Sequence, residues 1–567
     1  MSRVLTCALL IGVCMVSGCE KRPVERAVFS GTPAPRVEKE VPQAPSFTEA
    51  LDAYELGEQS LLSDPDLRAY LRALQHQLGE RTIASYRSAW DARADMVMDL
   101  TRRLSRHGLD IDSSQSQALE RLQTLRASSL AYGAWRGEAL QDAGQVRRLV
   151  EADHLVAFLW LRAAQGLGAL AGHPPESEVG MSMRLLHALA FWEVGSGLEH
   201  TLPPPMKAYW SLVEALERYE KMEEAAFGKL PKRIRRARPG KATPDILLLR
   251  QRLALEDPEG AGAGELWDEA LSEALRRARA AYQLKPKRKA RYLLDKRLVA
   301  ALEVPLKERI ATIKLNLRRW HHSKLRHFTY VIFVNLPEYH GEVWADAERL
   351  HRFKVVIGNT RKKGRLMVNA TPRLWSAVRT IVYNPYWTVP NRIYEEELLV
   401  KAEAFVAEQV ASSPALAAES ELIDSYWNSK GYEVFGKGRK SGRIWVRRKP
   451  GPGNALGKVK FLFDNLWAVF LHDTPQKRKF KATRRAFSHG CIRVHQPLDL
   501  AELLLRRDGQ WPAVEAAKVF SHYKEKVFSM KDPVWLVVDY LSTRVDEKGR
   551  THFYHDVYRR DHNLASR

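Results

Sequence analysis

The spacing of apolar residues predicts helices in the first half of the chain. Between residues 48 and 232, apolar positions recur every three or four residues, as in Leu149, Ala152, Val156, Leu159 and Ala163. This spacing gathers apolar side chains on one face of a helix, where a neighbouring element can bury them. Because the stretch contains no pattern typical of a catalytic site, we interpret it as a helical scaffold domain.

A smaller helical unit is predicted over residues 240–305. Its apolar positions form three helical segments, at 245–253, 275–284 and 293–302. The residues before it, 233–240, are basic and contain Pro239, a composition that suits a linker.

Beyond Trp320 the apolar period changes from helical to alternating. Six short segments have the pattern of strands, at 330–335, 353–357, 380–383, 459–463, 467–471 and 534–538. Together they predict a mostly β domain over 325–545, followed by a C-terminal tail at 546–567. Helical composition returns at 391–440, which we interpret as a capping insertion, since insertions between strands often cover a site.

The N-terminus has the pattern of an export signal. Arg3 precedes an apolar run from Val4 to Val16, too short for a membrane span, and small residues precede Cys19. This arrangement resembles a bacterial lipobox, which implies removal of residues 1–18 and acylation of Cys19. In such lipoproteins Glu20 favours the outer membrane. A plain secretion signal with an incidental cysteine is the alternative. Residues 19–47, rich in Pro and charged residues, suit a flexible tether.

Net charge limits the class of partner, and cysteine content points to a candidate nucleophile. A formal net charge of +23 favours a polyanionic partner: nucleic acid, an anionic membrane or an acidic wall polymer. Export argues against nucleic acid. Of the four cysteines, Cys7 and Cys14 leave with the signal and Cys19 carries lipid. Cys491 is then the only free thiol, and an unpaired thiol in an oxidising compartment is a candidate nucleophile.

The segment around Cys491 has the composition of a thiol active site. A thiol reacts as the thiolate and needs a base or a positive field, and His489 and Arg493 lie two residues to either side. Gly490 permits a tight turn that can aim backbone N–H groups at an oxyanion. His472 ends a predicted strand, a position from which it can face the thiol.

The ordered set His472, Ser488, His489, Gly490 and Cys491 resembles the signature of the YkuD family of L,D-transpeptidases. Further segments, at 384–390, 450–457, 471–475 and 554–561, resemble its large YcbB-like branch. The resemblance implies a multidomain fold: a helical scaffold, a small three-helix peptidoglycan-binding-like module and a mostly β catalytic domain with a helical cap.

The predicted unit at 240–305 is similar to that three-helix module. Tyr282-Gln283 stands where the family has a phenylalanine-glutamine pair, and the basic run 285–289 replaces a glycine-rich turn. A purely structural helical bundle is the alternative.

The resemblance also implies a mechanism. His472, oriented by the Asp473 main chain, takes the proton of Cys491, and the thiolate attacks a donor tetrapeptide stem and expels its terminal D-residue. An amine of a second stem then attacks the thioester, which links two third-position diamino acids. Backbone N–H groups at His489, Gly490 and Cys491 would stabilise the oxyanion, with a structural role as the alternative for the His489 side chain.

Substrate contacts are expected from Arg493, Ser488 and Asp473. A basic rim also surrounds the motif and would attract stem carboxylates, although at least half of these charges should simply be exposed. Its members are Lys477, Arg478, Lys479, Lys481, Arg484, Arg485 and Arg493.

Two other functions fit the sequence. With water as acceptor, the same thioester gives an L,D-carboxypeptidase or a peptidase that releases wall proteins. A non-enzymatic lipoprotein that anchors membrane to wall is the second. We expect no cofactor and no metal, since no metal-ligand cluster is visible. The expected partners are peptidoglycan stem peptides, a membrane reached through the lipid anchor, and cell-wall synthesis proteins, in the periplasm-facing cell envelope.

Overall fold

The computed structural model describes most of the chain beyond residue 89. The described residues are 90–127, 143–167, 206–346, 348–364, 366–412, 419–437, 444–511 and 523–561, with single positions in 69–74, in 182–189 and at 204. All of them belong to one compact unit, Pro45–Arg567. The expected signal, tether and Cys19 lie outside the described residues. None of the described helices has the length and apolar composition that a bilayer-spanning helix requires.

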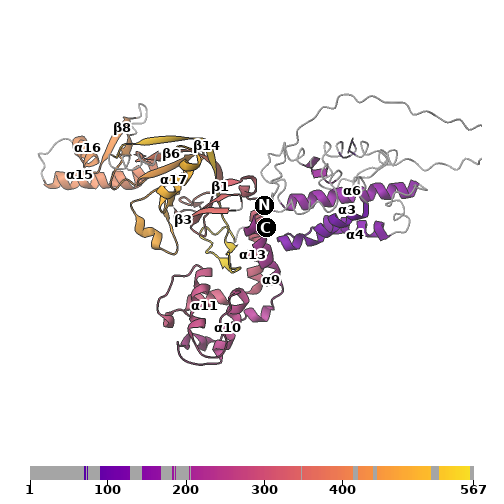
Figure 1. Cartoon of the computed structure of the whole chain (residues 1–567). Coiled ribbons are helices and arrows are strands. Elements are labelled where there is room, and N and C mark those ends of the chain that lie inside the picture. The colour runs from indigo at the N-terminus through magenta and orange to yellow at the C-terminus, as the bar shows by residue number, and fades with distance from the viewer. Residues whose placement is uncertain are drawn as a thin grey trace, which may run out of the picture. The chain divides into compact units, whose positions relative to one another are not determined.

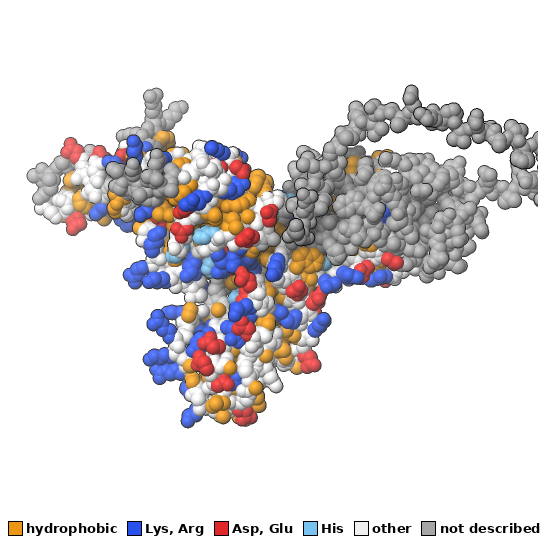
Figure 2. All heavy atoms as spheres, viewed as in Figure 1, with side chains coloured by type: hydrophobic (Ala, Val, Ile, Leu, Met, Phe, Trp, Pro, Cys, Tyr) orange, Lys and Arg blue, Asp and Glu red, His pale blue; other side chains and the backbone are white. Residues whose placement is uncertain are grey.

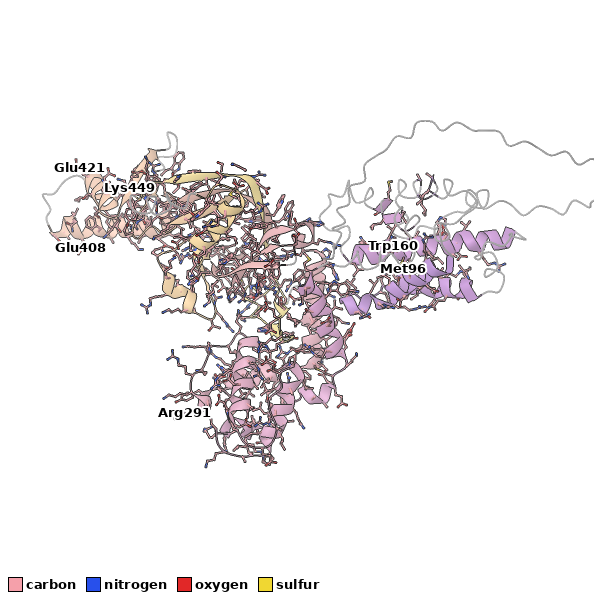
Figure 3. The ribbon with its side chains drawn as sticks, in the orientation of Figure 1. Met96, Trp160, Arg291, Glu408, Glu421 and Lys449 are labelled. Atoms are coloured by element: carbon pink, nitrogen blue, oxygen red, sulfur yellow. The ribbon has the colours of Figure 1, made fainter. Side chains whose placement is uncertain are left out.

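The N-terminal region is helical, as predicted. It contains α3 (Trp90–Arg102), the 3-10 turn η1 (Arg103–His107), α4 (Ser113–Ala127) and α6 (Ala143–Gly166). The periodic residues Ala152, Val156 and Leu159 of α6 are fully buried in the core that these helices share. Met96 of α3 and Trp160 of α6 belong to the same cluster and mark its place in Figure 3.

Two helices join this region to the β domain. They are α9 (Lys207–Glu220) and α13 (Leu306–His321), and they pack against each other. Leu212 of α9 and Ile313 of α13 share a core with the strand residue Phe333. The helices therefore bury one face of the sheet.

The small helical unit has the three predicted helices, α10 (Asp245–Glu256), α11 (Glu269–Ala281) and α12 (Lys296–Leu302). α10 and α11 lie side by side (Figure 1). The Asp268 and Asp295 side chains cap α11 and α12 by accepting backbone N–H groups. Three short 3-10 turns complete this part of the chain, η2 (Glu224–Phe227), η3 (Lys232–Arg236) and η4 (Ala290–Tyr292).

The segment 233–240 differs from the expected linker. Within η3, Ile234 is buried and packs in the core of the three-helix unit, together with Ile246 and Leu271. One apolar residue in a basic run is enough to anchor it, so the segment belongs to the unit.

A closed barrel forms the C-terminal domain. The nine-stranded sheet has the order β12-β3-β13-β11-β10-β6-β14-β1-β2, and β2 also pairs with β3, which closes the ring. Inward-facing residues such as Ile332, Ile381 and Phe461 form its core, with Leu500 and Leu504 of α17 (Pro497–Arg507). The strands are β1 (Tyr330–Asn335), β2 (His340–Ala345), β3 (Glu348–Gly358), β6 (Leu374–Tyr383), β10 (Val459–Phe463), β11 (Leu471–His472), β12 (Ala486–Ser488), β13 (Ile492–Val494) and β14 (Lys526–Asp539).

Five of the six predicted strands lie within these elements, but 467–471 is a strand only at its end. Residues 465–470 form a turn, because the Asn465 side-chain oxygen accepts N–H groups from Trp467 and Val469 at 3.1 and 3.0 Å. Ala468 takes a positive φ of 50° within it. Trp467, the first residue of the apolar run that predicted a strand, is 55% exposed.

The insertion is helical first and β afterwards. It contains α14 (Asn391–Ile393), the π-helical turn η6 (Tyr394–Leu399), α15 (Val400–Ser412) and α16 (Glu419–Ser429). Two strands follow, β8 (Tyr432–Lys437) and β9 (Ile444–Arg448), which pair with β7 (Trp387–Thr388) in the order β7-β9-β8. Trp427 and Val446 are buried at the centre. Glu408, Glu421 and Lys449 mark this part in Figure 3. The insertion therefore extends to Arg448, past the expected end at 440.

Residues beyond 545 are part of the fold. β15 (Thr543–Val545) pairs with β16 (Thr551–Phe553), and Tyr558 is buried in the barrel core. The described part of the expected tail, up to residue 561, is thus integrated in the barrel domain. The remaining short elements are η5 (Lys324–His327), β4 (Lys362–Lys363), β5 (Leu366–Met367) and η7 (Lys477–Lys481).

Candidate active site

Cys491 lies in the turn between β12 and β13 and is half-buried. Burial raises the pKa of its thiol, while the Phe470 backbone N–H and the positive charge of Arg493 lower it. The nearest carbonyl, that of Ala468, is 3.9 Å from Sγ. Because burial dominates, the resting group is a thiol, and it needs a base in order to react.

His472 is the candidate base. β11 pairs in parallel with β13 so that His472 lies opposite Arg493, and strand alternation places Cys491 on the same side as Arg493. Nδ1 of His472 lies 2.5 Å from the Asp473 carbonyl oxygen, which requires Nδ1 to carry a proton. Burial, aided by Arg493, lowers the pKa of His472 to about 3. The ring is therefore neutral, with the Nε2 lone pair free to accept a proton.

Asp473 holds this histidine through its main chain, the contact that the sequence suggested. Its carboxylate is buried and fixed in turn, because Oδ2 accepts the Lys458 N–H at 2.9 Å and Oδ1 binds the Lys477 ammonium. A Cβ at Gly457 would lie 2.3 Å from Asp473 Oδ2, and Gly457 has a φ of +60°. Only glycine fits beside this carboxylate. A direct contact of Asp473 with substrate stays a prediction.

The turn that presents Cys491 is held by Ser488. Its buried hydroxyl donates to the Cys491 carbonyl at 2.6 Å and accepts the Gly490 N–H at 3.2 Å. Gly490 has a φ of +131°, which favours glycine. The structure therefore places Ser488 inside the turn, and its expected contact with substrate stays a prediction.

Two residues that support the turn, Thr371 and Tyr558, were not predicted as site residues. Thr371 is fully buried; its hydroxyl donates to the Gly490 carbonyl at 2.8 Å and accepts the Gly358 N–H at 2.9 Å. The Tyr558 hydroxyl donates to the Gly358 carbonyl at 2.7 Å and accepts the Thr371 N–H at 3.1 Å. Burial raises the pKa of Tyr558 to about 12, so it stays a donor. Tyr558 lies in a segment that carried the family resemblance, whereas Thr371 had no signal.

Arg493 lies beside the thiol with one donor unused. Its Nη1 donates to Gln476 Oε1 at 2.9 Å, while Nε is buried and has no hydrogen-bond partner among the described residues. Arg485, also expected in the basic rim, is buried and donates to the carbonyls of Val355, Ala482 and Tyr339. Arg485 thus holds the loop together and is not free to attract substrate.

His489 points to the capping insertion. Its Nε2 lies 2.8 Å from Oε1 of Glu397, which belongs to the π-helical turn η6. The neighbouring Glu396 pairs with Arg361 at 2.6 Å. The insertion therefore reaches the motif around Cys491, and Glu397 is a candidate site residue that the sequence did not reveal.

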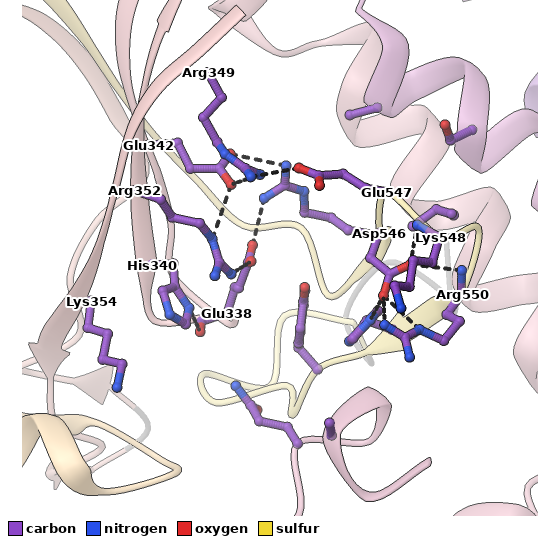
Figure 4. Close-up of a pocket in the computed structure, with 18 of the residues that line it drawn as sticks. Glu338, His340, Glu342, Arg349, Arg352, Lys354, Asp546, Glu547, Lys548 and Arg550 are labelled. Carbon is purple, nitrogen blue, oxygen red and sulfur yellow. Dashed lines mark hydrogen bonds and ion pairs between the residues drawn. The ribbon is translucent and has the colours of Figure 1, made fainter. Parts of the chain in front are cut away.

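A large polar cavity lies away from the thiol. It has a volume of about 1190 Å³ and is walled by α9, by β2 and β3, and by the β15–β16 hairpin; Cys491 and His472 do not line it. Glu338 and Glu342 lie at its centre and pair with Arg544 (Figure 4). Burial acts to raise the pKa of Glu338, but Arg544, His340 and Arg352 outweigh it and lower the pKa. Lys and Arg side chains are also numerous on the outer face of this part of the molecule (Figure 2).

Comparison with known proteins identifies the barrel. Residues 329–534 match the family model of the L,D-transpeptidase catalytic domain, YkuD. The barrel is therefore similar to the catalytic domain of this family. The match includes His472, the motif at 488–491 and the insertion, while the N-terminal helices and the three-helix unit lie outside it.

One curated relative and two solved structures are similar to the chain. A Haemophilus influenzae protein, provisionally named an L,D-transpeptidase, is 28% identical over 268 residues, which are 46% of this chain and 50% of the relative. The chain thus spans half the length of this relative. An L,D-transpeptidase from Xylanimonas cellulosilytica is 13% identical, with 53% of this chain and 97% of that chain covered and a TM-score of 0.18. One from Mycobacterium smegmatis is 12% identical, with 37% and 58% covered and a TM-score of 0.16.

Proposed function

We propose that the protein is a peptidoglycan L,D-transpeptidase that cross-links third-position diamino acids of stem peptides through a thioester on Cys491. The observation that carries the proposal is the state of His472 within the YkuD domain. Its ring is neutral, its Nδ1 is bound to the Asp473 carbonyl at 2.5 Å, and its strand β11 pairs with β13, which directly follows Cys491.

Acylation follows from these contacts. As Sγ of Cys491 attacks the donor carbonyl, its proton moves to Nε2 of His472. When the C–N bond of the tetrahedral intermediate breaks, the His472 imidazolium passes this proton to the leaving nitrogen, and the terminal D-residue departs as the amine. A thiol and a neutral imidazole in the resting enzyme suit a proton transfer that accompanies the attack, because neither group is charged beforehand. The backbone N–H groups of His489 and Cys491 would bind the oxyanion, since that of Gly490 donates to Ser488 Oγ. Arg493, whose positive charge acts on Cys491, would bind a stem carboxylate.

The remaining parts would bring the domain to its substrate. Acylated Cys19 and the tether would hold the protein at the periplasmic face of a membrane, with the outer membrane favoured. The three-helix unit would contact peptidoglycan, with the basic residues from 285 to 291 on its exposed side; Arg291 is labelled in Figure 3. Proteins of cell-wall synthesis are candidate partners.

The test is mass spectrometry of peptidoglycan digested after incubation with the mature protein. We expect dimers joined through third-position diamino acids, and none with Cys491→Ser. Tripeptide stems without dimers would establish the carboxypeptidase alternative. Unchanged peptidoglycan that still binds the protein would establish the anchoring alternative and refute the proposal.

A further inference from the structure

The capping insertion contributes a carboxylate to the catalytic motif. Glu397 Oε1 lies 2.8 Å from His489 Nε2. Glu397 belongs to a π-helical turn, a conformation that is rare and frequent at functional sites. The insertion is fixed near this contact, since Glu396 pairs with Arg361 and Arg392 donates to the Val368 carbonyl at 3.3 Å. These contacts hold Glu397 against the motif.

The two histidines of the site have different surroundings. His472 is 5% exposed, and its hydrogen-bond partner is a backbone carbonyl. The His489 side chain is 32% exposed and faces a carboxylate. A carboxylate next to an imidazole fixes the tautomer and stabilises the imidazolium that forms when the ring accepts a proton. With Nε2–H held by Glu397, Nδ1 of His489 is left as the proton acceptor.

The proposed cross-linking reaction needs two proton transfers at different stages. The first removes the proton of Cys491 and falls to the buried His472. The second removes a proton from the acceptor amine, which arrives from solvent after the thioester has formed. An accessible imidazole suits the second transfer better than a buried one.

Resting on the proposed function, we infer that His489 is the base for the acceptor amine and that Glu397 of the insertion is its positioning residue. The neutral amine nitrogen attacks the thioester carbon, and one N–H proton moves to Nδ1 of His489 as the N–C bond forms. The tetrahedral intermediate then collapses: the C–S bond breaks, the amide is complete and Cys491 leaves as the thiolate. The thiolate recovers a proton from the His489 imidazolium, which restores the starting state.

This arrangement makes one half-reaction depend on the insertion. Acylation uses only groups of the barrel and does not need Glu397. Aminolysis needs the insertion in place, because only then is the His489 ring held with Nδ1 free.

The experiment separates the two half-reactions with Glu397→Gln. The acyl-enzyme is formed from a tetrapeptide-stem donor whose own side-chain amine is acetylated, and intact-protein mass spectrometry measures the acylation rate. A second stem peptide with a free diamino acid is then added at several concentrations. The slope of the loss of acyl-enzyme against acceptor concentration reports aminolysis. Glu395→Gln is the matched control, since the exposed Glu395 lies in the same turn.

We expect Glu397→Gln to lower the aminolysis slope by about tenfold or more, part of the usual contribution of a general base. Acylation should change by less than about twofold on the same scale. Glu395→Gln should match the parent in both, and Glu397→Asp should recover part of the slope. An unchanged slope in Glu397→Gln, or acylation slowed as much as aminolysis, overturns the inference and leaves the proposed function intact. A parent that never acylates overturns the proposed function and the inference with it.

Discussion

Replacement of Thr371 tests how the fold holds the turn that carries Cys491. Thr371→Val keeps the shape of the side chain but removes the hydroxyl that serves the Gly358 N–H and the Gly490 carbonyl, at 2.9 and 2.8 Å. Both groups then stay buried without a partner, at a cost of about 1–3 kcal/mol each. We expect the free energy of unfolding to fall by about 2–6 kcal/mol in total.

Thr371→Ser is the matched control. It keeps the hydroxyl and loses one buried methyl group, which should cost only about 1 kcal/mol. Urea unfolding followed by tryptophan fluorescence measures stability, and the rate of labelling by a carbapenem measures the reactivity of Cys491. Because the Gly490 carbonyl is released only in the valine variant, that variant alone should label slowly. Equal stability and equal labelling of the two variants would refute the reasoning.

Three further changes have defined outcomes. Cys491→Ala should abolish labelling by a carbapenem without a change in circular dichroism; equal labelling of parent and variant would rule out Cys491 as the nucleophile. Gly457→Ala should slow labelling of Cys491 at least about tenfold. The new Cβ would lie 2.3 Å from Asp473 Oδ2 and would displace the residue that holds His472. Labelling at the parent rate would show that the Asp473 carboxylate is dispensable. Burial lowers the pKa of His472 from 6.5 to about 3, so the stability that the neutral ring contributes is present above pH 6.5 and is lost as pH falls toward 3. Over that pH range, the free energy of unfolding of His472→Gln should therefore fall less than that of the parent protein. An equal fall in both proteins would contradict burial of His472 as the cause.

The spacing of residues along the sequence predicted the features that depend on neighbouring residues, namely strands, helices and the motif around Cys491. The strands at 330–335 and 459–463 were found from alternation, and both match the observed bounds of β1 and β10. The helices of the three-helix unit were found from their apolar period. The motif around Cys491 was recognised because its residues are close together in sequence, and the parallel pairing of β11 with β13 brings His472 to it.

The failures have a common physical cause, which is contact between distant residues. Nothing near Thr371 in the sequence announces a hydrogen bond to Gly490, 119 residues away. Glu397 lies in a run of three glutamates that reads as a solvated helix face. The turn at 465–470 replaced a predicted strand because one side-chain amide, that of Asn465, satisfies two backbone N–H groups. The residue types in a local stretch of sequence do not predict which particular groups will form hydrogen bonds or ion pairs.

Two contacts of the site differ in strength: the strand register that places His472 is held strongly, and the contact between His489 and Glu397 is weak. The register that places His472 is fixed by Leu471 and Ile492, which are paired across β11 and β13 and fully buried. A slip by one residue would turn both toward the opposite face and forfeit about 1.5–3 kcal/mol for each. The His489–Glu397 contact joins two partly exposed side chains, and such pairs contribute only about 0–1 kcal/mol. Thermal motion can therefore open the second contact while the first persists. Under the proposed function, Cys491 and His472 would stay together throughout, while the His489–Glu397 contact would open to admit the acceptor stem and close again before aminolysis.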